Sequence, residues 1–170
     1  MAPAPDTLTL GEPSDVPRPW RRRVALALVS LIPIFALANA FGQRPDTSSA
    51  STPAARLQVY APTHARSGLI YAVRFRVDAA RDLKRATLEL DPGWAEQYTV
   101  NGIAPQPVSE GSHDGRLVFV LGHIARGTHY TLWLSLQINP TNVGRHRQSV
   151  ALFDAGQQLL VIRRTITIWP

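Results

Sequence analysis

The 170-residue sequence predicts an all-β domain, an antiparallel two-sheet sandwich of seven to eight strands, preceded by one transmembrane α-helix. Three observations support this fold class. An uncharged run covers residues 24–42, hydrophobicity alternates with period two from Leu57 onward, and turn residues such as Asn101-Gly102 separate the alternating segments. The same strand spacing also permits an open barrel, which we keep as the alternative.

The length and composition narrow the class of protein further. A chain of this length has room for one ordinary domain. The absence of cysteine excludes disulfides, thiolate catalysis and cysteine zinc sites. The formal net charge is +6, with seventeen arginines and one lysine spread along the chain. This charge would attract anionic lipid headgroups or acidic envelope polymers, but a modest excess of this kind is also explained by solubility alone. No sequence pattern predicts nucleic-acid binding.

The apolar run at 24–42 is just long enough for a membrane helix, which needs about 20 residues. Arg21, Arg22 and Arg23 directly precede it, so the positive-inside rule places residues 1–23 in the cytoplasm as a disordered tail. We therefore expect a single-pass signal anchor in the cell membrane, with the C-terminal domain extracytoplasmic.

Signal-peptide cleavage is the alternative to an anchor. Ala38 and Ala40 form the small-residue pattern that a signal peptidase accepts, and cleavage after Ala40 would give a secreted protein. The leader before the run is long, rich in proline and partly acidic, unlike the short basic n-region of a signal peptide. We therefore expect the segment to be retained.

Residues 43–56 are rich in Ser, Thr, Pro and Ala, which predicts an extended linker before a domain at 57–170. In the segment from Leu69 to Val77 every second residue is apolar, as it is again from Tyr130 to Ile138. These two segments are the strongest strand predictions. Weaker strands are predicted at 57–61, 86–90, near 98–101, and at 117–121, 149–153 and 159–168.

The turns between these strands resemble those of a known group. Leu121-Gly122-His123-Ile124 and the residues up to Gly127 look like an "L-G-x-L-x-x-G" turn, and Asn139-Pro140 to Gly144 is similar to a "P-x-x-x-G" turn. Leu90-Asp91-Pro92-Gly93 resembles an "L-P-x-G" turn. Together they resemble bacterial extracytoplasmic immunoglobulin-like modules of the DUF11-like group. The resemblance implies an immunoglobulin-like sandwich that serves as a spacer, adhesion or interaction unit and brings no catalytic residues.

The sequence contains no familiar catalytic or nucleotide-binding motif, and we predict no catalytic residue, metal, cofactor or small-molecule substrate. His123 and His129 flank a turn and would bind a metal only if a carboxylate such as Asp114 joined them. Acidic residues near 78–96 are expected to be solvated or paired with arginine. An enzyme using Asp91, Glu96 and His113 remains a third, disfavoured class.

The best predicted interaction surface comprises Trp94, Tyr98, Trp133, Arg74 and Arg76. Trp94 and Tyr98 lie in the irregular stretch 91–115, although Trp94 could instead cover the end of the core. Trp133 lies in the alternating segment from Tyr130 to Ile138, on the face opposite to the leucines of that segment. We also expect Arg163 and Arg164 to protect an edge strand from indiscriminate pairing.

These observations predict a non-catalytic protein that binds or modulates another membrane or envelope protein beside the lipid bilayer. The alternative is a secreted module that recognises an anionic envelope polymer through its arginines.

Overall fold

The computed structural model describes residues 19–37 and 43–170, which belong to two separate units of the chain. In the first unit, helix α1 (Pro19–Leu37) begins before the predicted span and contains Pro33. The predicted cleavage residues, Ala38 and Ala40, lie outside the described residues. Within residues 19–37 and 43–170, we find no helix whose length and hydropathy suit a membrane crossing.

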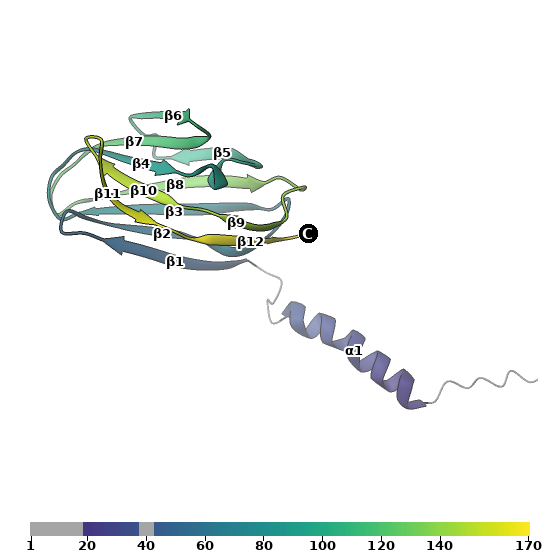
Figure 1. The fold of residues 1–170 in the computed structure, drawn as a ribbon. Helices are drawn as coiled ribbons and strands as arrows, with labels where there is room; N and C mark the ends of the chain where they lie inside the picture. Colours follow the sequence, from purple (N-terminus) through teal and green to yellow (C-terminus); the bar gives the residue numbers. More distant parts are fainter. Residues whose placement is uncertain (1–18, 38–42) are drawn as a thin grey trace, which may run out of the picture. The chain divides into compact units, whose positions relative to one another are not determined.

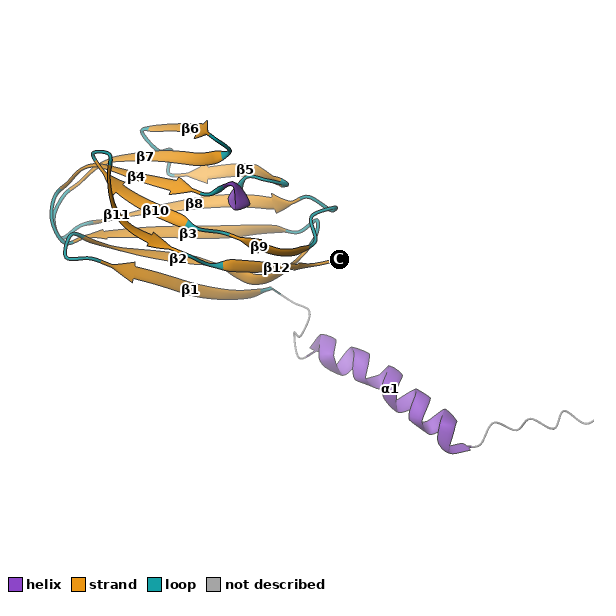
Figure 2. Cartoon of the chain, viewed as in Figure 1, coloured by secondary structure: helices purple, strands orange, loops and turns teal. Residues whose placement is uncertain are grey.

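The second unit is a β-sandwich, which confirms the predicted sandwich (Figures 1 and 2). The seven-stranded sheet has the order β5-β8-β3-β2-β12-β9, with β1 also pairing with β2, and the five-stranded sheet has the order β11-β10-β4-β7-β6. Neighbouring strands are antiparallel except for β12 and β2. The first sheet contains β1 (Arg44–Ser51), β2 (Ala55–Arg66), β3 (Ile70–Ala79), β5 (Tyr98–Ala104), β8 (His129–Ile138), β9 (Gly144–Arg147) and β12 (Thr165–Trp169). The second contains β4 (Leu83–Leu90), β6 (Ser109–His113), β7 (Arg116–Ile124), β10 (Val150–Asp154) and β11 (Gln157–Ile162).

The described residues form twelve strands, more than the seven to eight predicted. The predicted linker is wrong in part, because residues 44–51 form β1 and pair with β2 in continuous register from Pro45 to Ser51. Strand pairing requires only backbone groups, so a segment of small hydroxyl residues forms an edge strand without burying any large side chain. Strands β6 and β9 were missed for the same reason, since neither contains an apolar alternation.

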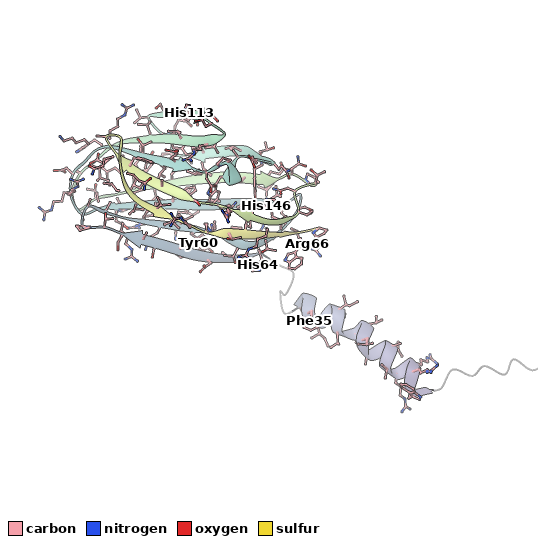
Figure 3. All side chains as sticks on the ribbon, viewed as in Figure 1. Phe35, Tyr60, His64, Arg66, His113 and His146 are labelled. Carbon is pink, nitrogen blue, oxygen red and sulfur yellow. The ribbon has the colours of Figure 1, made fainter. Side chains whose placement is uncertain are left out.

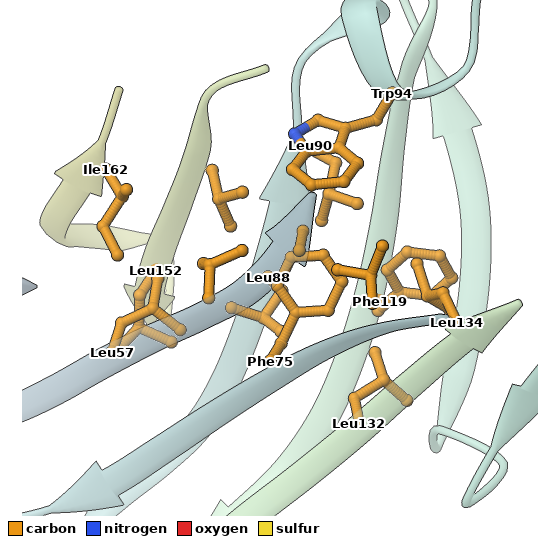
Figure 4. Close-up of a cluster of buried hydrophobic side chains, with 14 of the residues drawn as sticks. Leu57, Phe75, Leu88, Leu90, Trp94, Phe119, Leu132, Leu134, Leu152 and Ile162 are labelled. Carbon is orange, nitrogen blue, oxygen red and sulfur yellow. The ribbon is translucent and has the colours of Figure 1, made fainter. Parts of the chain in front are cut away.

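The core lies between the two sheets and is built from the predicted inward faces (Figure 4). Leu132, Leu134 and Leu136 of β8 are completely buried, as are Val73 and Phe75 of β3. The alternation of both strands therefore sets which face is inward. Leucines of β4 and β10 complete the opposite side, including Leu88, Leu90 and Leu152.

One end of the core is closed by a short 3₁₀ turn, η1 (Pro92–Trp94). Trp94 is fully buried, and its ring lies 5.5 Å from that of Phe75 in an edge-on arrangement (Figure 4). Its indole Nε1 donates a hydrogen bond of 3.0 Å to the carbonyl of Ser149. The Ser149 amide in turn donates to Asp91 Oδ2 at 2.8 Å. The turn that begins at Asp91 is therefore fastened to the chain between β9 and β10.

The predicted long strand at 159–168 is interrupted, because β11 and β12 belong to different sheets. Arg164 lies between them, and its side chain is buried rather than guarding an edge, which corrects the expectation for this residue. Its Nη2 donates hydrogen bonds to the carbonyls of Ala61 (2.9 Å) and Pro62 (3.0 Å). Arg163 remains exposed.

The close approach of η1 to β9 makes a stability prediction. A Cβ built at Gly93 would overlap the carbonyl oxygen of Arg147, whereas one at Gly111 would meet nothing. We expect Gly93→Ala to lower the free energy of unfolding by about 2 kcal/mol, because backbone must move to relieve the overlap. Urea denaturation measures the loss, with Gly111→Ala as the matched control. Equal stability of the two variants would contradict the packing of η1 on β9.

Candidate interaction surface

Three side chains form a row across the outer face of the seven-stranded sheet. The strand registers pair Tyr60 of β2 with Arg74 of β3, and Arg74 with Trp133 of β8. The Arg74 guanidinium carbon lies 5.2 Å from the centroid of the Tyr60 ring and 5.5 Å from that of Trp133. We call Tyr60, Arg74 and Trp133 the aromatic ladder. Each cation–π contact is worth about 0.5–1 kcal/mol at an exposed site and restrains the arginine between the rings.

A shallow apolar hollow of about 270 Å³ lies beside Trp133. Small residues of three neighbouring strands form its walls together with Ile103, namely Ala72, Gly102, Ala104 and Ser135. Trp133 itself is 41% exposed. The outward-facing residues of β3 and β5 at this point, Ala72, Gly102 and Ala104, are small, so this face of the sheet is recessed next to an exposed indole.

Charge is distributed unequally between the two sheets. Among the side chains that the structure describes, the strands of the five-stranded sheet carry three basic and three acidic residues, Lys84, Arg85, Arg116, Glu89, Glu110 and Asp154. The strands of the seven-stranded sheet carry six arginines and two aspartates, Arg56, Arg66, Arg74, Arg76, Arg145, Arg147, Asp46 and Asp78. The net positive charge of the sandwich strands is therefore carried by the sheet that presents the aromatic ladder.

The structure brings together only part of the predicted interaction surface. Arg74 and Trp133 are in contact, and Arg76 lies on the same face, where its Nε is 2.9 Å from Asp78 Oδ1. Trp94 is buried and covers the core, as the alternative interpretation had it, so it does not belong to the surface.

Tyr98 is partly buried, and its ring packs edge-on against that of Tyr71 with centroids 6.4 Å apart. Burial raises the pKa of both hydroxyls, and the shift is larger for Tyr71. Gln148 donates from Nε2 to the Tyr98 hydroxyl at 3.4 Å. These residues form a polar cluster inside the sandwich rather than a contact surface.

The residues considered for metal binding or catalysis are not assembled into a site. Within the described part of the chain, no group of three or more His, Asp or Glu side chains is placed to hold a metal ion. His113 pairs with Asp114 at 3.1 Å on an exposed turn, and Glu89 pairs with Arg116 at 2.7 Å. Asp91 accepts a hydrogen bond from the Ser149 amide, which gives it a structural role.

Tyr60 was missed in the sequence, although a signal for it was present. Leu57, Val59 and Ala61 alternate as inward residues, which places Tyr60 on the outer face. Its contact with Arg74 depends on how β2 and β3 are aligned, and periodicity within one segment does not determine that register.

No protein-family model and no curated protein matches the sequence. The resemblance to DUF11-like modules therefore stays a prediction. Among solved structures, a non-cellulosomal cohesin from the archaeon Archaeoglobus fulgidus is similar at 15% identity, covering 63% of this chain and 86% of that one, with a TM-score of 0.41. WR4, an MSP family member of C. elegans, is similar at 9% identity, covering 61% and 88%, with a TM-score of 0.35. The sandwich assignment rests on the strand pairing of this chain.

The different environments of two tryptophans make a second prediction. Trp94→Ala should lower the free energy of unfolding by about 3–5 kcal/mol, because it removes a buried ring and its hydrogen bond. Trp133→Ala should change it by less than about 1 kcal/mol, because the ring is exposed and loses mainly its contact with Arg74. Chemical denaturation followed by circular dichroism measures both. A larger loss for Trp133→Ala would contradict the assignment of Trp133 to the surface.

Proposed function

We propose that this protein is a non-catalytic binding module for another membrane or envelope protein, and that the aromatic ladder is the centre of its contact surface. The observation that carries the proposal is the exposed indole of Trp133 held against Arg74 beside an apolar hollow. Tryptophan, tyrosine and arginine are the residue types that dominate the energetics of protein interfaces.

The fixed position of Arg74 within the aromatic ladder supports a role of the ladder in partner binding. Arg74 contacts an aromatic ring on each side, and its backbone belongs to a strand that is paired with β2 and β8. A side chain held in place before binding loses less conformational entropy when the partner arrives. The hollow beside Trp133 would receive an apolar side chain of the partner, and the Trp133 indole would pack against that side chain.

The charge asymmetry favours a second candidate, recognition of an anionic envelope polymer. Such a polymer would follow the arginine-rich face and would dissociate steeply with rising salt, because screened charges would supply most of the attraction. Binding centred on the ladder would persist in salt, because contacts with aromatic rings depend less on long-range charge.

We propose in addition that the N-terminal segment keeps the domain at the cell membrane, with the N-terminus cytoplasmic. In support, the side chains of α1 from Val24 to Phe35 that the structure describes are exposed, and most are apolar. Arg21, Arg22 and Arg23 precede them. Release after Ala40 would instead give the secreted form.

The contact surface is tested by crosslinking the full chain in its native envelope and quantifying the recovered partner. We expect Trp133→Ala and Arg74→Ala each to weaken partner binding about 30-fold or more, as hot-spot residues do. Trp169→Ala is the matched control, because Trp169 is 47% exposed and lies outside the ladder. Repeating the capture in high salt separates the two candidates.

Retention of the same partner by both ladder variants would contradict the proposed surface. Loss of capture in the control Trp169→Ala as well as in both ladder variants would indicate a general effect of altering the surface. That result would also contradict the proposal. Binding that vanishes in high salt for the unchanged protein would favour the anionic polymer.

The anchor is tested by extraction of membranes with alkaline carbonate and by determining the N-terminal residue of the recovered protein. We expect the chain to stay in the membrane pellet with its leader intact, because the apolar residues after Arg23 favour the lipid phase. Phe41 at the N-terminus, together with release into the supernatant, would establish the secreted form instead.

A further inference from the structure

A second hollow lies at the edge of the seven-stranded sheet, where β9 pairs with β12. Its volume is about 390 Å³, and it is lined by Arg145, His146, Arg147 and Thr165. The register pairs Arg147 with Thr165 and Arg145 with Thr167. Figure 3 labels His146 on β9 and His64 on the nearby β2. Two arginines, a histidine and a threonine therefore line the hollow, and none of the described residues that line it is acidic.

The two arginines have no ionic partner in the described part of the chain. The ion pairs found there engage Arg76, Arg81, Arg116 and His113. Arg145 and Arg147 both have exposed side chains, and they alternate along β9 with one residue between them, so they project from the same side of the strand. Two neighbouring cations without a counter-charge repel each other, and an anion bound between them would relieve that repulsion.

The backbone that carries these arginines is fixed on two sides. Four residues of β9 pair with β12, from Arg147↔Thr165 to Gly144↔Ile168. The carbonyl of Arg147 packs against Gly93, and the next amide, that of Gln148, donates to the carbonyl of Arg164 at 2.9 Å. An edge strand held in this way presents its side chains at set positions, which lowers the cost of binding.

We propose that this hollow is a binding site for a phosphate group. Two forked guanidinium groups and a threonine hydroxyl offer more hydrogen-bond donors than the two oxygens of one carboxylate accept at good geometry, whereas a phosphate presents more oxygens and more charge. His146 lies between the two arginines on β9 and points to the opposite side of the strand, where its Nε2 is 3.2 Å from the carbonyl of Val143. The phosphate of a lipid headgroup and a free phosphate share this chemistry.

The site is separate from the exposed indole of Trp133 and the hollow beside it. Trp133 belongs to β8 and Arg145 to β9, and the sheet order places four strand spacings between those strands. At about 4.8 Å for each spacing, the two strands are about 19 Å apart. Phosphate binding and partner binding are therefore testable independently, and the failure of one proposal leaves the other standing.

The test is a titration of the full-length protein with inorganic phosphate at low ionic strength, followed by calorimetry or by NMR chemical shifts. We expect Arg145→Ala combined with Arg147→Ala to weaken binding at least about tenfold, because charged hydrogen bonds are lost. Thr165→Val should weaken it about threefold by removing one neutral donor. Lys84→Ala combined with Arg85→Ala is the matched control, since it removes two exposed charges from the other sheet.

Unchanged phosphate affinity in the double arginine variant would overturn the proposal, as would an equal loss in the control, which would indicate general charge attraction. Acetate binding as tightly as phosphate would also overturn it. Vesicles of phosphatidylglycerol in phosphatidylcholine separate the two sources of phosphate. If the arginine variant also binds these vesicles more weakly, the ligand is a lipid headgroup, and if only free phosphate is affected, it is a soluble phosphate.

Discussion

Burial of the Arg164 guanidinium beneath Trp94 is the constraint on which the sandwich depends. A charged group taken out of water loses its hydrogen bonds to water, and Arg164 replaces part of them by donating from Nη2 to the carbonyls of Ala61 and Pro62. Its buried Nε and Nη1 have no hydrogen-bond partner among the described residues. Its guanidinium carbon lies 5.7 Å from the centroid of the Trp94 ring, and burial lowers its pKa. These contacts join β2, the crossing between β11 and β12, and the turn that closes the core.

The same contacts position the outer surfaces. The carbonyl of Arg164 accepts a hydrogen bond from the Gln148 amide. The indole of Trp94 donates one to the carbonyl of the next residue, Ser149. The chain leaving β9 is therefore fixed from within the core, and the arginines of β9 are fixed with it. In the aromatic ladder, the buried inward residues of β2 and β3 set the register that brings Tyr60 beside Arg74. Buried contacts thus determine which exposed side chains meet.

The sequence predicted what depends on periodicity and missed what depends on register. The strand at residues 129–138 and the outward direction of Trp133 follow from alternation alone, and the structure has the strand at the predicted residues. The crossing at Arg164 was missed because the apolar residues on either side of it read as one strand. Strand β1 was missed because an edge strand needs only backbone pairing. The Tyr60 contact and the β9 hollow depend on pairings between segments far apart in the sequence.

The position of Arg164 also bears on the charge of the molecule. Its guanidinium donates to carbonyls of β2, so this buried charge lies against the same sheet that carries the exposed arginines. A charge inside the sandwich is less screened by salt than one on the surface. The exposed arginines give the strands of this sheet a net positive charge, and the guanidinium of Arg164 adds a further charge between the sheets, while the basic and acidic residues on the strands of the other sheet balance. An anionic partner would be oriented toward the seven-stranded sheet before any contact forms.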